Sequence, residues 1–134
     1  MPTKNKKRSE MNSAYATYNQ NNAQVESPQK LVLMLYEGIL RFVARAKKAI
    51  EDKDIEQKVL FCNKTMAIFF ELMNSLDMKQ GQISQYLQGM YARQIQVILK
   101  ASLENDSDML DEVIKVTRGM IDAWKEVTQE DELA

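Results

Sequence analysis

Four long stretches of the chain repeat apolar residues in steps of three and four, and only a few polar residues separate each stretch from the next. Such steps are typical of helices that bury one face. They predict helices over about residues 28–52, 54–76, 82–104 and 107–128, and no strand pattern competes with them. Because the connections are short, consecutive helices must run antiparallel. We therefore expect an all-α protein, an antiparallel up-down four-helix bundle.

Residues that favour helix ends lie at the predicted boundaries. Ser27-Pro28 is a strong start, since Ser accepts a hydrogen bond from an unpaired backbone N–H and Pro suits the first helical position. Asp54 can cap the second helix, and Gly81 lies in the polar break before the third. Residues 105–107, Asn-Asp-Ser, supply a turn and an N-cap before the fourth.

The apolar block 31–36 follows the first helix start directly. Six consecutive apolar positions cover well over half of a helix circumference, which is more than one buried face needs. We expect this helix to bury one face in the core of the bundle and to offer another face to a partner.

Two segments precede the bundle. Residues 1–10 are mostly basic and lack an apolar pattern, so they are predicted to form a disordered tail ahead of a single domain over 11–130. Met11, Tyr15 and Tyr18 share one helical face, which predicts a short N-terminal cap helix over about 11–20. A helix of that length is ordered only if it docks on the body, so its attachment is a candidate for reversible control.

Composition argues against several classes of protein. The chain has no His, the commonest general base and metal ligand, and its four Gly form no phosphate-binding loop. We expect no enzyme, no metal and no cofactor. A carboxylate-only hydrolase or metal bundle would need acidic residues on the core seam, whereas Glu37, Glu71 and Glu112 are expected on or near outer faces.

Charge, hydropathy and cysteine content narrow the partners and the compartment. The tail holds four of the 18 basic residues and one of the 19 acidic ones, so the remainder is net negative, which disfavours nucleic acid. No stretch of about 18 apolar residues predicts membrane insertion. The single Cys62 lies among apolar residues, which predicts a small buried thiol and fits the reducing cytoplasm.

Five short segments together resemble the FliS family of flagellar export chaperones, which are specific for flagellin. They are residues 15–18 (Tyr-Ala-Thr-Tyr), 27–38 from Ser-Pro-Gln-Lys-Leu to Tyr-Glu-Gly, Met90-Tyr91, 103–106 (Leu-Glu-Asn-Asp) and 123–125 (Ala-Trp-Lys). Each segment alone is a weak signal, but their order on this helical frame is specific. The resemblance covers about residues 12–128. The chain departs from the family pattern at Ala92-Arg93 and Gln96-Val97, where family members often carry an Asp-Tyr pair and arginines.

The resemblance implies a cytoplasmic chaperone that binds the disordered C-terminal segment of flagellin. Such a chaperone prevents premature filament assembly and delivers flagellin to the flagellar type III export gate; a co-chaperone is a further candidate partner. A small helical-bundle adaptor that joins folded proteins is the alternative reading of the same residues.

The flagellin-binding groove is predicted to use residues of the first and third long helices. The candidates are Leu31, Leu35, Tyr36, Ile39, Tyr91 and Ile95. Each aliphatic residue of this set can equally belong to the core. The two tyrosines are the better candidates because their hydroxyls need water or a partner. Trp124 is assigned to the core.

Two further features carry hypotheses about binding. The cap helix, through Tyr15 and Tyr18, is predicted to cover the groove in the free protein and to leave it when flagellin binds. Gly38 and Gly89 lie inside helices, where Gly is unfavourable. Close approach of a neighbouring backbone would explain them, through either helix packing or client binding.

Overall fold

The computed structural model describes residues 27–133, with side chains described through Gln129. The predicted tail 1–10 and the cap helix with Met11, Tyr15 and Tyr18 lie outside the described residues. Contacts along the chain separate residues 1–31 from a compact unit that comprises residues 32–134, and the packing below is that of this second unit.

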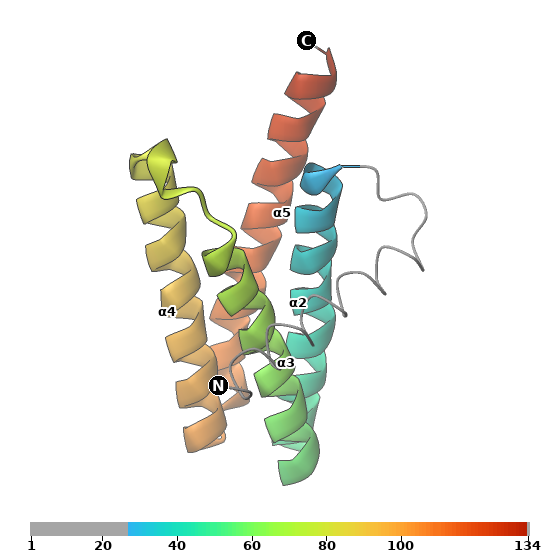
Figure 1. Ribbon diagram of the computed structural model, residues 1–134. Helices are drawn as coiled ribbons and strands as arrows, with labels where there is room; N and C mark the ends of the chain where they lie inside the picture. Colours follow the sequence, from blue (N-terminus) through green and yellow to red (C-terminus); the bar gives the residue numbers. More distant parts are fainter. Residues whose placement is uncertain (1–26, 134) are drawn as a thin grey trace, which may run out of the picture. The chain divides into compact units, whose positions relative to one another are not determined.

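Four long helices make up the described part of the chain (Figure 1). Their bounds, with those of two short 3₁₀ turns, are α2 (Pro28–Glu51), α3 (Ile55–Asn74), η1 (Met78–Gln80), α4 (Gln82–Glu104), η2 (Ser107–Met109) and α5 (Leu110–Leu133). The predicted all-α bundle is confirmed, and no strand occurs within residues 27–133.

The helix ends follow the capping signals of the sequence. Ser27 Oγ accepts from the backbone N–H of Lys30 at 3.3 Å, and Asp54 Oδ1 accepts from that of Gln57 at 3.1 Å. Asn105 ends α4 in the left-handed conformation, with φ of 53°, which Asn tolerates better than most residues. The fourth helix differs from its predicted bounds. It begins with the η2 turn and continues beyond residue 128 to Leu133, because Glu and Gln are good helix formers even where the apolar pattern has ended.

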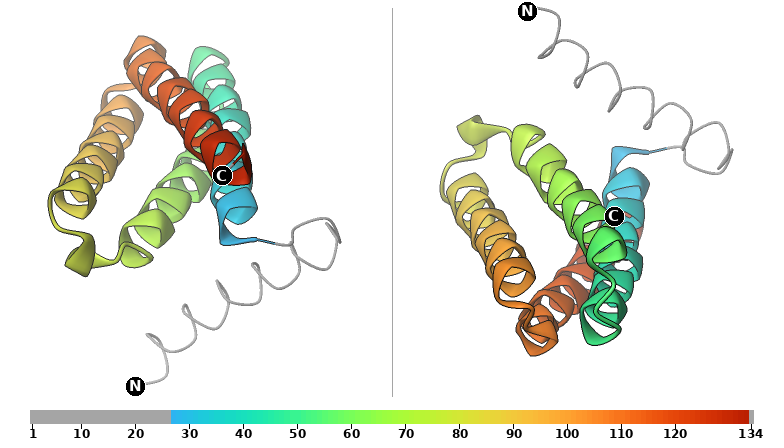
Figure 2. Two further views of the ribbon diagram at one scale, coloured as in Figure 1. Left: turned by 90° about the horizontal axis from the view of Figure 1, so that it is seen from above. Right: turned by 90° about the horizontal axis from the view of Figure 1, so that it is seen from below.

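The four helices pack around one core, with α2 and α4 each beside α3 and α5 (Figure 2). α4 packs against both α3 and α5. The ring of Phe42 on α2 lies 6.1 Å from that of Phe61 on α3, and Lys47 Nζ of α2 lies 2.6 Å from Asp111 Oδ1 of α5. α2 and α4 therefore lie diagonally across the bundle, and so do α3 and α5.

The core runs along the centre of the bundle. Its fully buried side chains include Ile39, Phe69, Ile98, Leu110 and Val113, contributed by all four helices. Cys62 is 1% exposed, so the predicted buried thiol is confirmed. Burial raises the pKa of this thiol, which keeps it neutral. Within residues 27–133 no helix combines the length and the apolar character that crossing a membrane requires.

Candidate functional site

The structure brings Tyr36 and Tyr91 together, but inside the bundle. Their side chains are 3% and 2% exposed, and the two hydroxyl oxygens lie 2.6 Å apart, so one hydroxyl donates a hydrogen bond to the other. Phe69 packs against the Tyr91 ring at 6.0 Å, and Trp124 meets the Tyr36 ring edge-on at 6.3 Å. Burial raises the pKa of both hydroxyls, so the pair stays neutral.

The expectation that these tyrosines lie on an outer groove is therefore wrong. α2 and α4 lie diagonally opposite each other, so side chains that they point towards each other meet in the core and cannot line one outer groove. Ile39 is also fully buried, whereas Leu31, Leu35 and Ile95 are half-buried. A role of these six residues in flagellin binding stays a prediction. Trp124, which the sequence analysis assigns to the core, is partly buried and packs against the core.

Several apolar residues that recur at helical spacing in the sequence are exposed in the structure. On α3 and α4, Ile55 is 70% exposed, Ile83 69% and Leu99 49%. Val127 on α5 is 52% exposed. All of them follow the three- and four-residue steps, but they lie at helix ends or on the edges of the stripe, where none of the four described helices covers them.

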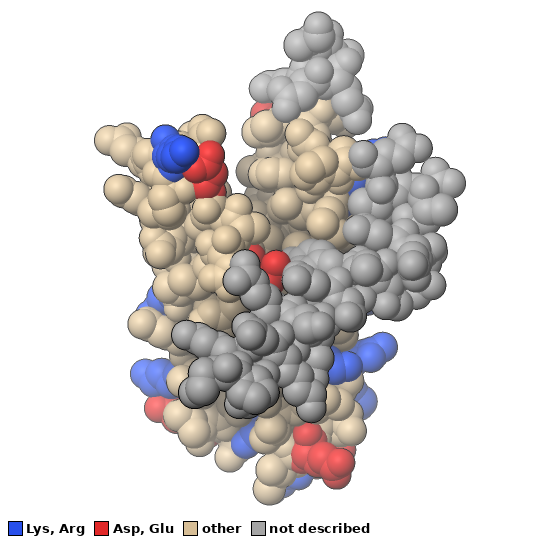
Figure 3. All heavy atoms as spheres, in the orientation of Figure 1, with Lys and Arg blue, Asp and Glu red and all other residues tan. Residues whose placement is uncertain are grey.

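An uncharged surface runs along the outside of α3 and α4. Every residue in it is exposed or half-buried, and none carries a charge. We call it the neutral face; it comprises Val59, Asn63, Met66 and Phe70 on α3, and Gln85, Gln88, Gly89, Ala92, Ile95, Gln96, Leu99 and Leu103 on α4. On both helices these positions recur every three or four residues, and α4 adds the adjacent pairs 88–89 and 95–96, so they share one side of each helix. In Figure 3 the column on the left, which is α4, shows a long stretch of surface without charged atoms below its upper end.

The register of α3 against α4 aligns the two halves of this face. Lys58 Nζ near the start of α3 donates to Ser102 O at 3.0 Å and to Asn105 Oδ1 at 2.8 Å, at the end of α4. Further along, Phe69 packs on Tyr91. The antiparallel pair is thus in contact at two levels, which sets how the two halves of the neutral face lie against each other.

The sequence contains a signal for this face that the periodicity analysis missed. α4 spans 23 residues but carries only Arg93, Lys100 and Glu104 as charged residues. Its remaining exposed positions are largely Gln and aliphatic side chains. An exposed helix with so few charges is unusual, because charged residues normally dominate the solvated side. Counting charges on the predicted outer side of each helix would have selected α4.

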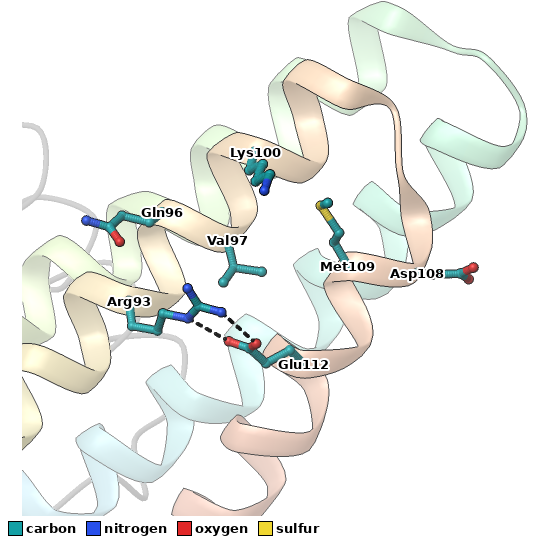
Figure 4. Close-up of a pocket in the computed structure, with 7 residues that line it drawn as sticks. All are labelled: Arg93, Gln96, Val97, Lys100, Asp108, Met109 and Glu112. Carbon is teal, nitrogen blue, oxygen red and sulfur yellow. Dashed lines mark hydrogen bonds and ion pairs between the residues drawn. The ribbon is translucent and has the colours of Figure 1, made fainter.

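A second, smaller feature lies on the other side of α4, where it meets η2 and α5. Figure 4 shows this pocket of about 330 Å³, with Val97 and Met109 as its apolar lining. Arg93 closes one end through two hydrogen bonds to Glu112, Nε to Oε2 at 3.3 Å and Nη2 to Oε1 at 3.1 Å. Glu112 is thereby paired with Arg93 at the surface. The described residues include no group of three His, Cys, Asp or Glu side chains that could hold a metal ion.

Comparison with known proteins identifies the family. The model of the family described as "Flagellar protein FliS" matches residues 11–131. The chain is 55% identical over 124 residues to the flagellar secretion chaperone FliS of Campylobacter jejuni, covering 92% of this chain and 97% of that one. It is 35% identical over 115 residues to the flagellar secretion chaperone FliS of Bacillus subtilis, covering 86% of each chain. It is 33% identical over 102 residues to that of Escherichia coli, covering 75% of each. The chain therefore belongs to the FliS family of flagellar proteins.

Proposed function

We propose that this chain is a cytoplasmic flagellar secretion chaperone that binds the C-terminal segment of flagellin and delivers it to the flagellar export apparatus. Family membership supports the chaperone role, since the relatives reported above are named flagellar secretion chaperones. The function is that of a binding protein, with no catalytic step. Bound flagellin is kept from assembling before export.

The neutral face is the observation that carries the binding part of this proposal. Phe70 is 49% exposed, Leu99 49% and Leu103 75%. A cluster of large exposed apolar side chains on one surface is typical of a binding site. The two-helix surface fits an amphipathic helix, which lays its own apolar stripe along the junction of α3 and α4.

Absence of charge on this face determines which kind of helix it favours. A charged client residue placed against it would lose water without gaining an ion partner, which is costly. The Gln side chains of α4 can instead exchange hydrogen bonds with uncharged polar groups at the rim of the contact. A client segment that is disordered in solution and folds on this surface would bury on the order of 1,000–3,000 Å² in total.

The test is to mix the chain with a peptide that comprises about the last forty residues of flagellin and to record far-UV circular dichroism and calorimetry. We expect the helical signal of the mixture to exceed the sum of the separate signals, because the peptide orders as it binds. A scrambled peptide of equal composition is the control. A heat of binding without any gain of helicity would instead support the adaptor reading, in which partners bind already folded. Absence of both signals would refute flagellin binding.

A further inference from the structure

Gly89 lies in the middle of α4, where glycine is a poor choice for the free chain. It is exposed, and apart from its chain neighbours and the nearby backbone of its own helix no heavy atom of the described residues lies within 4 Å of the position that a Cβ would occupy. Gly38 is different, because a Cβ there would lie 3.4 Å from Ile68 Cδ1 of the neighbouring helix. Packing within the bundle explains Gly38. It does not explain Gly89, which weakens its helix relative to Ala.

Gly89 belongs to the neutral face, and so do its helix neighbours Gln85 and Ala92. On a helix surface its neighbours are three and four residues away, namely Gln85, Tyr86, Ala92 and Arg93. Arg93 is held by Glu112, so the only charge among them is already paired. Because Gly89 has no side chain and that of Ala92 is small, the two residues leave a shallow depression on the surface of α4.

Large side chains lie next to this depression. Tyr86 is 69% exposed and lies one turn before Gly89 on the same helix. Phe70 is 49% exposed and follows Phe69, whose ring packs on Tyr91 at 6.0 Å, so Phe70 lies at nearly the same level of the bundle. The distance between two packed helices depends on the side chains at their contact, so a glycine flanked by larger residues lets another helix approach closely at one point.

We propose that Gly89 is the point of closest approach for the client helix on the neutral face, and that this contact selects a client helix with a small residue at the crossing. The inference rests on the proposed function, because it takes the flagellin C-terminal segment as the occupant. Glycine at position 89 then favours the complex with the client helix, although it lowers the stability of the free chain.

Gly119 on α5 offers a matched control. It too is an exposed glycine inside a helix, and apart from its chain neighbours and the nearby backbone of its own helix no heavy atom of the described residues lies within 4 Å of its Cβ position. Its helix neighbours Lys115 and Asp122 are charged, and it lies outside the neutral face. A substitution at Gly119 therefore reproduces the helix-propensity effect without touching the proposed contact.

The experiment compares Gly89→Gln and Gly119→Gln, because Gln adds volume without charge and matches the Gln residues already on the face. We expect both variants to melt at a higher temperature than the parent chain, since Gln is a better helix former. In calorimetry with the flagellin peptide, Gly89→Gln should weaken binding about tenfold, the effect of overpacking a close contact. Gly119→Gln should bind as the parent does, and Gly89→Ala should lie between the parent and Gly89→Gln.

The outcomes separate the inference from the proposed function. If the parent chain fails to bind the peptide, flagellin binding itself is refuted. If the parent binds and Gly89→Gln binds as tightly, the contact at Gly89 is refuted while the proposed function stands. An equal loss in Gly119→Gln would likewise overturn the inference, because the effect would not be local to the neutral face.

Discussion

The hydroxyl oxygens of Tyr36 and Tyr91 lie 2.6 Å apart in the buried centre of the bundle. Their hydrogen bond joins α2 to α4, the helix that lies diagonally opposite. A buried hydroxyl without a partner is costly, so the two side chains are tolerated in the core only as a pair. Their separation of 55 positions along the chain makes this contact a test of whether α2 and α4 have reached their native places.

The first prediction concerns the loss of one hydroxyl. Tyr36→Phe leaves the Tyr91 hydroxyl buried without its partner, so we expect the free energy of unfolding to fall by about 1–3 kcal/mol. Tyr91→Phe should have a similar effect. The double variant should lose less than the sum of the two, because no orphaned hydroxyl remains. Urea unfolding of the three variants gives the coupling energy, and strictly additive losses would show that the hydrogen bond does not exist.

The second prediction is an alkaline loss of stability. Burial raises the pKa of Tyr91 and Tyr36 above the ordinary value near 10, so above pH 10 the unfolded chain releases protons that the folded chain retains. Unfolding is then favoured as the pH rises, by up to about 1.4 kcal/mol per pH unit for each such group.

Unfolding midpoints measured between pH 8 and 11 would check this slope. The pKa of the Cys62 thiol is raised by burial as well, so it contributes in the same direction. The variant with both tyrosines replaced by Phe retains Cys62 and should show a clearly shallower slope above pH 10. An unchanged slope in that variant would contradict the assignment to the tyrosine pair.

The third prediction tests a helix cap. The Asp54 carboxylate accepts from the backbone N–H of Gln57 at the start of α3, and loss of such a cap costs about 1 kcal/mol. Asp54→Ala should therefore lower the unfolding midpoint in urea without changing the slope of the transition. Asp52→Ala is the control, because its carboxylate makes only an exposed ion pair with Lys48 at 3.4 Å, and such pairs contribute little. Equal effects of the two substitutions would refute the cap.

The sequence was sufficient for the fold because the relevant signals are local. Residues three and four apart report a helix face, and caps such as Asp54 act within one turn. Short connections then leave antiparallel packing as the only arrangement. The burial of Tyr36 could not be predicted in this way, because it depends on a hydroxyl from a different helix. The apolar ring of Tyr36 suits a core position and a surface position equally.

The neutral face illustrates a different limit of sequence analysis. Periodicity marks Leu99 as apolar at a helical spacing, but it cannot distinguish a side chain covered by a neighbour from one that is left open. Which side of α4 is covered depends on the positions of α3 and α5. Once the structure supplies those positions, the missing charges on the open side become informative.

The fourth prediction places a charge on the neutral face. Leu99 is 49% exposed, so Leu99→Asp removes only part of the area that a core leucine buries and should destabilise the free chain less than a core substitution would. A carboxylate there would be desolvated under a client helix, so we expect flagellin-peptide binding to weaken by about 2 kcal/mol or more. Val127→Asp on α5 is the matched control, because Val127 is 52% exposed and lies outside the face. Calorimetric titration of both variants should show a selective loss for Leu99→Asp, whereas equal affinities would exclude the neutral face as the binding surface.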